Sequence, residues 1–218
     1  KAMERMRGLG GTNLGIVLNF EYAEPADDSE ASIKAASRYD GIYNRWFLGG
    51  LMHKRYPEDI ESHLEPYLPE NYQNDLDTLI GELDWLGVNY YTRAVVADDP
   101  GTPFPSLKLG SGPLPKTTLG WEIFPEGFSR LLTRIWQDYS GDLPLYITEN
   151  GLSLDDQVEN GHVADPIRVA YVNDHIHELH KVIAAGAPVN GYFLWSLLDN
   201  YEWALGYDKR FGMVHVDF

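Results

Sequence analysis

The segment PLYITENG, residues 144–151, joins a hydrophobic run to an acidic side chain. Its first half has the aliphatic and aromatic residues that are typical of a buried β-strand. Glu149 follows directly, and Asn150 and Gly151 come after it. Because Asn and Gly favour turns, the strand is predicted to end here, with a carboxylate at its carboxyl end.

Four segments have this composition, each apolar and each ending in polar residues. Runs this short indicate strands that are covered on both faces, as in parallel sheets with helical crossovers. The four predicted strands are LGIVLNF (14–20), WLGVNYY (85–91), LPLYITEN (143–150) and GYFLWSLLDN (191–200).

Helical patterns lie between the predicted strands. The clearest has Asp165 as its N-cap and Pro166 as its first residue, and it ends at Gly186. A second helix is predicted from about Ser29 to Phe47, and a third over roughly 125–139. The apolar positions expected on the buried faces are Val169, Val172, Ile176, Leu179 and Ile183 in the first helix, and Ile33, Ala36, Tyr43 and Phe47 in the second.

Strands that alternate with helices and end in polar residues predict an α/β fold of the (β/α)8 TIM-barrel type, whose active sites lie at the carboxyl ends of the strands. Only four strands are found. Residues 1–11, KAMERMRGLGG, have the pattern of a helix entered midway, and no closing helix follows the fourth strand. We therefore expect residues 1–218 to be the carboxyl-terminal half of one barrel domain, about strands 5 to 8.

Residues 98–121, DDPGTPFPSLKLGSGPLPKTTLGW, are dense in proline and glycine. They follow a predicted strand end, so we expect a long loop on the catalytic face. A loop of this length in a compact domain is usually functional.

The composition excludes several classes of partner. Seventeen basic and 33 acidic residues give a net charge of −16, which repels nucleic acids and anionic membranes. No stretch approaches the roughly 18 apolar residues of a membrane span, and no apolar signal core is found at the N-terminus. Without cysteine or an Asn-x-Ser/Thr site, a bacterial cytoplasmic location is expected, with export as the alternative.

Aromatic residues make up 13% of the chain, with 6 Trp and 14 Tyr, and many are next to Asn, Asp or Glu. This mixture suits sugars, whose rings have an apolar face and a rim of hydroxyls. Taken alone, each Trp is more typical of a core than of a sugar site.

The octapeptide LYITENGL, residues 145–152, resembles the nucleophile signature of glycoside hydrolase family 1, the β-glucosidase family. The resemblance covers nearly the whole chain, because five further motifs occur in the same order. They are WFLGGLMHKRYP, WLGVNYYT, GWEIFPEG, DPIRVAYVNDHI and GYFLWSLLDNYEWALGYDKRFG.

The resemblance implies retaining hydrolysis of β-glycosides, which uses two carboxylic groups about 5–5.5 Å apart. It makes Glu149 the nucleophile that forms a covalent glycosyl-enzyme. Asn89 and Tyr91 match positions that hydrogen-bond near the sugar 2-hydroxyl and hold the nucleophile. For the VNYY motif, packing of aromatic side chains at a strand end is the alternative interpretation.

The same resemblance implies where the sugar binds. Trp195, Glu202 and Trp203 match the residues that bind the glycone, and Phe211 borders the same subsite. Trp121 matches the usual aromatic residue of the leaving-group subsite.

One comparison within the family bears on the substrate. Members that act on 6-phosphorylated glycosides carry Ser in place of Glu202 and Tyr in place of Phe211, beside a Lys equivalent to Lys209. Because a glutamate repels a phosphate dianion, we expect an unphosphorylated sugar.

The acid/base glutamate of the family belongs to an Asn-Glu-Pro tripeptide after the fourth barrel strand. The chain has AEP at residues 23–25, but Glu24 follows the predicted fifth strand and lacks the Asn, so we interpret it as a surface loop acid. The acid/base is then expected upstream of Lys1. The expected partner is the amino-terminal half of the same barrel, in the same or a nicked chain, and these 218 residues alone are expected to be inactive.

The segment HIHELHK, residues 175–181, does not fit the zinc-protease motif, because only Leu179 separates Glu178 from His180. We interpret it as a solvated helix face. No metal site and no cofactor are expected.

These observations predict a β-glucosidase that removes terminal non-reducing glucosyl residues from cello-oligosaccharides or aryl glucosides. Galactose and fucose remain alternatives for the glycone. Two other functions stay open, namely a non-catalytic carbohydrate-binding derivative and an S-glycosidase, which has Gln in place of the acid.

Overall fold

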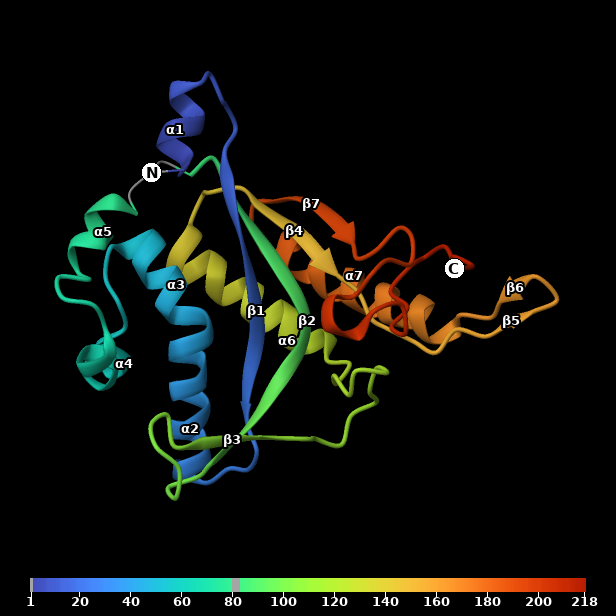
Figure 1. Ribbon diagram of the computed structural model, residues 1–218, viewed down its shortest axis with the longest axis horizontal. Coiled ribbons are helices and arrows are strands. Elements are labelled where there is room, and N and C mark those ends of the chain that lie inside the picture. The colour runs from blue at the N-terminus through green and yellow to red at the C-terminus, as the bar shows by residue number, and fades with distance from the viewer. Residues whose placement is uncertain (1, 80–82) are drawn as a thin grey trace.

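The computed structural model describes residues 2–79 and 83–218. Its main sheet has four parallel strands, each hydrogen-bonded to the next in chain order (Figure 1). They are β1 (Gly15–Pro25), β2 (Trp85–Asp98), β4 (Leu145–Asn150) and β7 (Val189–Leu194). All four predicted strands are confirmed, and the strands β1 and β7 form the two edges.

The strand ends differ from the prediction in two ways. β1 and β2 continue to Pro25 and Asp98, because their pairing extends past a register shift at Phe20/Tyr22. β7 stops at Leu194 instead of residue 200, since the chain then turns to pair Ser196 with Phe211 through the hydrogen bond from Ser196 N to Phe211 O.

Helices cover one face of this sheet (Figure 1). The second predicted helix forms a continuous helical run with π-helical turns, and the other two are also confirmed. The helical elements are α1 (Ala2–Gly8), α2 (Glu30–Asp40), η1 (Gly41–Arg45), α3 (Trp46–Leu48), η2 (Gly49–His53), α4 (Glu58–Leu64), η3 (Glu65–Tyr67), α5 (Asn74–Thr78), α6 (Pro125–Arg134), η4 (Ile135–Ser140), α7 (Pro166–Ala184) and η5 (Trp203–Leu205).

The core lies between the sheet and the helices α6 and α7. Alternate residues of β2 are fully buried against these helices, so the residues between them face the opposite side of the sheet. The main core contributors are Leu86, Val88 and Tyr90 of β2, Leu145 and Ile147 of β4, Phe128, Leu131 and Leu132 of α6, and Leu179 and Val182 of α7.

The predicted buried face of α7 is wrong. Val169, Ile176 and Ile183 are exposed, and of the predicted positions only Leu179 is fully buried. The face turned to the protein carries polar residues, including Arg168 and Tyr171, whose groups are hydrogen-bonded inside the fold. A search for apolar residues at helical spacing does not detect polar residues that are buried in pairs. The spacing therefore assigned the buried face to the wrong side of the helix. The second helix shows the same effect, since Ile33 and Phe47 are exposed.

Residues 98–121 are not wholly irregular. They contain a strand, β3 (Leu107–Gly110), which pairs antiparallel with the end of β2 from Val95 to Asp98. A separate hairpin, β5 (Val158–Glu159) with β6 (His162–Val163), follows β4.

Glu24 lies in β1 and is not a loop residue, so its interpretation as a surface loop acid is wrong. Its side chain is 29% exposed, and Glu24 Oε2 lies 4.0 Å from Arg93 Nη1 on the neighbouring strand. The positive charge of Arg93 on β2 compensates the partly buried carboxylate.

The interpretation of residues 175–181 as a solvated helix face is wrong for His175, which is fully buried. Its Nδ1 lies 2.8 Å from the carbonyl oxygen of Tyr171 and donates to it, and the buried Nε2 has no hydrogen-bond partner among residues 2–79 and 83–218. The ring stacks on Tyr171, with 3.9 Å between the centroids. Burial lowers the pKa of His175 to about 4, against weaker opposing effects of the Tyr171 hydrogen bond, Asp174 and Glu178.

We predict that this histidine makes folding stability depend on pH. Between pH 6.5 and about 4 the unfolded chain binds a proton that the folded chain excludes, so stability falls as the pH is lowered through this window. The expected loss is about 3 kcal/mol, measured as the free energy of urea unfolding at each pH. His175→Phe should flatten this part of the profile, whereas the exposed His180→Phe should leave it unchanged.

Candidate functional site

The candidate site lies at the carboxyl end of β2 and β4, on the face away from the helices. Register pairs Val88 with Ile147 and then Asn89 with Glu149, which leaves Thr148 as an extra residue in β4. A bulge of this kind re-aims neighbouring side chains. Thr148 Oγ1 donates to Asn89 Oδ1 at 2.6 Å, and Glu149 is brought to Tyr91.

The closest contact of the site joins Tyr91 to Glu149. The Tyr91 hydroxyl donates to Glu149 Oε2 at 2.5 Å. Burial raises the pKa of Tyr91 far above its ordinary value, and the hydrogen bond to Glu149 and the charges of Glu149 and Glu202 raise it further. The phenol therefore keeps its proton and remains a donor to the carboxylate.

Asn150 fixes the other side of the same strand end and is fully buried. Its Nδ2 donates to the carbonyl oxygen of Tyr90 at 2.8 Å and to the hydroxyl of Tyr171 at 2.9 Å. Its Oδ1 accepts from the hydroxyl of Tyr192 at 2.8 Å. One amide thus ties β4 to β2, α7 and β7, directly next to Glu149.

Gly151 is required because the backbone at Trp195, the residue after β7, approaches it closely. A Cβ placed there would lie 1.9 Å from the carbonyl oxygen of Trp195, so no side chain fits. The sequence drew attention to Asn150 and Gly151 only as turn residues, whereas the structure shows both holding the strand end. Their direct adjacency to Glu149 was the available signal.

Three aromatic rings gather beside Glu149. The ring centroids of Tyr91 and Trp121 are 5.5 Å apart, those of Tyr91 and Phe211 6.1 Å, and those of Trp121 and Phe211 6.2 Å. The three residues come from β2, from the segment before α6 and from the carboxyl-terminal segment. The fold thus brings together aromatic residues that are far apart in the sequence.

Trp195 and Glu202 also meet, since Trp195 Nε1 donates to Glu202 Oε1 at 3.3 Å. Trp203 is different, because 86% of it is exposed and its ring has no aromatic partner among residues 2–79 and 83–218. Lys209 Nζ donates to the carbonyl oxygen of Thr118 at 3.1 Å, which connects the last segment to residues 98–121. The structure thus links Tyr91 to Glu149, Trp121 and Phe211, and separately links Trp195 to Glu202. Asn89 is held by Thr148, next to Glu149, and Trp203 stands apart from both groups.

The family is decided by a comparison over the full length. The model for glycosyl hydrolase family 1 matches residues 1–218. The chain belongs to this family.

Two curated relatives and one solved structure show the extent of the similarity. β-Glucosidase A of Thermotoga maritima is 43% identical over 208 residues, which are 94% of this chain and 46% of the relative. A β-glucosidase of an Agrobacterium species is 41% identical over 213 residues, or 94% of this chain and 45% of the relative. The solved family 1 β-glucosidase of T. maritima matches with a TM-score of 0.93 and 40% identity, over 99% of this chain and 48% of that chain.

The chain therefore spans about half the length of the curated relatives it matches. The solved relatives are TIM barrels, and the four parallel strands with helices on one face are half of such a barrel. The predicted family and the predicted half-barrel fold are both confirmed.

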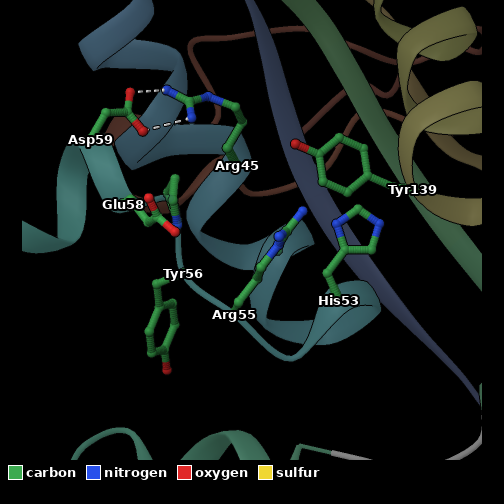
Figure 2. Close-up of a pocket in the computed structure, with 9 residues that line it drawn as sticks. Arg45, His53, Arg55, Tyr56, Glu58, Asp59 and Tyr139 are labelled. Carbon is green, nitrogen blue, oxygen red and sulfur yellow. Dashed lines mark hydrogen bonds and ion pairs between the residues drawn. The ribbon is translucent and has the colours of Figure 1, made fainter.

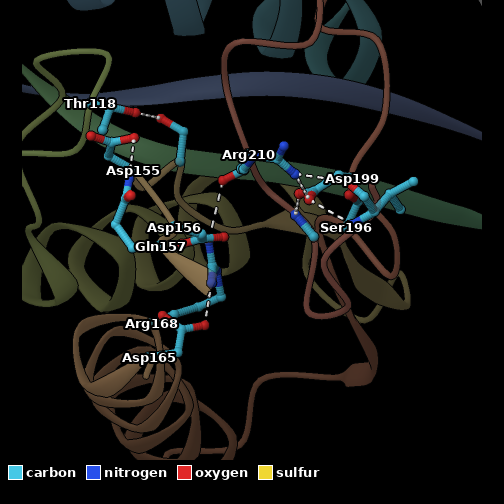
Figure 3. A network of polar contacts seen from close by, with 12 residues as sticks. Thr118, Asp155, Asp156, Gln157, Asp165, Arg168, Ser196, Asp199 and Arg210 are labelled. Carbon is cyan, nitrogen blue, oxygen red and sulfur yellow. Dashed lines mark hydrogen bonds and ion pairs between the residues drawn. The ribbon is translucent and has the colours of Figure 1, made fainter. Parts of the chain in front are cut away.

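A network of charged groups holds the carboxyl-terminal segment of this family 1 chain in place (Figure 3). The buried Asp199 carboxylate accepts from Arg210 Nη1 at 2.7 Å, from Gly212 N at 2.9 Å and from Val216 N at 3.1 Å. Burial alone would raise the pKa of Asp199, but these hydrogen bonds and the charge of Arg210 outweigh it and lower the pKa. The carboxylate thus closes the segment that carries Glu202 and Phe211.

A second ion-pair group joins α7 to the same segment. Arg168 Nη2 lies 3.0 Å from Asp156 Oδ2, and the guanidinium also contacts Asp165. Arg168 Nη2 donates in addition to the carbonyl oxygen of Arg210 at 3.2 Å. The network therefore extends from the loop after β4, through the first turn of α7, to the residues beside Phe211.

We predict that Asp199→Asn destabilises the protein. The change removes the negative charge that pairs with Arg210. It also replaces one acceptor oxygen by an NH2 group, which then faces N–H donors instead of accepting from them. The expected decrease in the free energy of unfolding is about 2–3 kcal/mol, the usual worth of hydrogen bonds to a charged group. The exposed Asp208→Asn is the matched control and should leave urea unfolding unchanged. An equal effect of both substitutions would contradict the role of the network.

A cleft of about 490 Å³ lies elsewhere, between η2, α4 and η4 (Figure 2). Tyr139 and His53 stack in its wall, with 5.0 Å between centroids, and Arg45 Nη2 pairs with Asp59 Oδ2 at 2.7 Å. Tyr139 precedes the amino end of β4, whereas Glu149 lies near its carboxyl end. The cleft is thus separate from the candidate site.

Within the described ranges, 2–79 and 83–218, no group of three or more His, Asp or Glu side chains is arranged to hold a metal ion. Among the helices in these ranges, none is long and apolar enough to cross a membrane.

Proposed function

We propose that the chain is the carboxyl-terminal half of a retaining β-glucosidase that removes terminal non-reducing β-D-glucosyl residues. The observation that carries this proposal is the 2.5 Å hydrogen bond from Tyr91 to Glu149, beside the rings of Trp121 and Phe211. The relatives named β-glucosidase, which share about two residues in five with this chain, support the same activity.

In the proposed reaction Glu149 is the nucleophile. One of its carboxylate oxygens attacks the anomeric carbon of the glucosyl residue, and the bond from that carbon to the leaving-group oxygen breaks. A carboxylic acid on the other side of that bond gives its proton to the leaving oxygen. The same group then takes a proton from water, whose oxygen replaces Glu149 on the anomeric carbon.

Tyr91 orients the nucleophile in this reaction. Its hydroxyl retains its proton and donates to Glu149 Oε2, which leaves the second oxygen for attack. Asn89 holds a position opposite Glu149 in the strand pairing, and its amide nitrogen is proposed to meet the sugar near the 2-hydroxyl. Asn89 Oδ1 accepts from Thr148, which orients the amide with Nδ2 free to donate.

The proposed glycone contacts come from the carboxyl-terminal segment. Glu202 offers two acceptor oxygens to neighbouring sugar hydroxyls, and Trp195 offers the face of its indole as a platform. Phe211 borders the same subsite. The indole N–H of Trp203 is proposed to donate to a sugar hydroxyl. The ring of Trp121 is proposed as the surface on which the leaving group stacks.

The acid/base group is proposed to lie in the amino-terminal half of the barrel, which is also the proposed partner of the two open edges, β1 and β7. Glu24 is unsuited to the role because it points at Arg93 within the sheet. The loop over residues 98–121 is proposed to face the substrate, since the ring of its last residue, Trp121, lies 5.5 Å from that of Tyr91. A cytoplasmic location is part of the same proposal.

Covalent trapping tests the nucleophile. A 2-deoxy-2-fluoro-β-D-glucosyl fluoride slows release of the glycosyl-enzyme, so the natural polypeptide that contains these residues should gain one fluoroglucosyl group on the peptide carrying Glu149. Peptide mass spectrometry locates the label. Glu149→Gln should abolish labelling, and the exposed Glu159→Gln should retain it. A label on another residue refutes the nucleophile assignment, and no label at all favours a non-catalytic carbohydrate-binding derivative.

We also predict a preference for unphosphorylated sugars. Glu202 places a negative charge at the glycone contacts, and Lys209 is held by the carbonyl oxygen of Thr118. Like charges brought together cost several kcal/mol. The natural polypeptide should therefore have a kcat/KM for 4-nitrophenyl β-glucoside at least about tenfold above that for its 6-phosphate. Glu202→Ser should narrow the ratio, and a wild-type preference for the phosphate would contradict the assignment.

A further inference from the structure

Glu122 is the residue after Trp121, and its side chain is only 4% exposed. The carboxylate has one strong ion pair, in which Arg93 Nε lies 2.7 Å from Glu122 Oε2. Its other oxygen, Oε1, accepts from Leu114 N at 3.1 Å and lies 3.6 Å from Lys116 Nζ. A buried carboxylate costs stability unless it is paired in this way.

The segment before α6 folds around this carboxylate. A Cβ at Gly112 would lie 2.7 Å from both carboxylate oxygens of Glu122, so the backbone approaches the charge directly. Lys116 Nζ donates to the carbonyl oxygen of Gly112 at 2.7 Å, and Thr117 N donates to that of Trp121 at 2.9 Å. The path of the chain on both sides of Trp121 is thus set by contacts around Glu122.

The backbone of Glu122 is fixed as well. Its carbonyl oxygen accepts from Thr92 Oγ1 at 2.9 Å, and Lys116 and Glu122 form an antiparallel bridge. Neighbouring residues of an extended segment point to opposite sides. When Glu122 points at Arg93, Trp121 is turned the other way, toward Tyr91 and Phe211.

Arg93 connects this arrangement to the strand that carries Tyr91. It lies two residues further along β2, its side chain is 10% exposed, and its guanidinium lies over the ring of Phe124 at 4.5 Å. Glu24 Oε2 lies 4.0 Å from Arg93 Nη1 and has no hydrogen-bond partner in the part of the chain that the structure describes. One arginine thus compensates a carboxylate from β1 and another from the Trp121 segment.

We propose that the Arg93–Glu122 ion pair is a positioning device that fixes the Trp121 indole against Tyr91, and thereby sets recognition of the leaving group. The inference rests on the proposed function. Neither residue touches the sugar in this scheme. Both act through Trp121, so their loss should weaken reactions whose leaving group stacks on the indole and spare reactions whose leaving group has no ring.

The test compares two substrates in the natural polypeptide that contains this chain. 4-Nitrophenyl β-glucoside has an aromatic leaving group, and β-glucosyl fluoride has none. Glu122→Gln keeps an oxygen for Leu114 N but removes the charge opposite Arg93. We expect kcat/KM for the aryl glucoside to fall at least tenfold, mainly through KM, and kcat/KM for the fluoride to change less than twofold.

Two controls separate positioning from a general loss of structure. Glu159→Gln makes the same chemical change on the exposed β5–β6 hairpin and should alter neither substrate. In a Trp121→Ala background, Glu122→Gln should change kcat/KM for the aryl glucoside less than twofold, because the indole it positions is gone. An equal loss on both substrates, or an undiminished loss in that background, overturns the proposal.

If Glu122→Gln does not fold, Arg93→Lys serves as the second variant. It keeps the positive charge but loses the Nε donor that meets Glu122 Oε2, and the same selective loss is expected. An unselective loss with Arg93→Lys overturns the proposal as well. Failure of the proposed function has a different result, since the wild-type polypeptide would then hydrolyse neither substrate.

Discussion

The candidate site depends on one irregularity in the pairing of β2 with β4. Regular alternation would send Thr148 and Glu149 to opposite faces of the sheet. The extra residue at Thr148 lets Thr148 reach Asn89 while Glu149 reaches Tyr91. The bulge thus places two pairs of polar groups on the face away from the helices, without exposing the apolar residues that the same strands bury behind them.

Polar side chains are as important as apolar ones in holding this arrangement. Asn150 is fully buried and meets three different elements, and Asp199 closes the last segment by accepting from one arginine and two backbone N–H groups. Such groups have directional partners, so they fix orientation in a way that nonspecific packing does not. The hydrogen bonds of Asn150 therefore fix the strand end that carries Glu149, and those of Asp199 fix the segment that carries Glu202 and Phe211.

The sequence predicted the strands well, because each is a short apolar run with a polar end, and the family motifs pointed to Glu149, Tyr91 and the aromatic residues. It failed where polar residues are buried in pairs. The buried face of α7 was misassigned because Arg168, Tyr171 and His175 do not look like core residues. The strand β3, the burial of His175 and the register shift at Thr148 were also missed, since each depends on contacts between segments far apart in the chain.

Within the described residues, β1 and β7 are each hydrogen-bonded to one strand of the main sheet, β1 to β2 and β7 to β4. Addition of further strands to this sheet is thus confined to the outer sides of β1 and β7. The hydrogen bonds from Tyr91 to Glu149 and from Thr148 to Asn89 join the two inner strands, β2 and β4. A strand that adds at either edge therefore leaves these contacts in place.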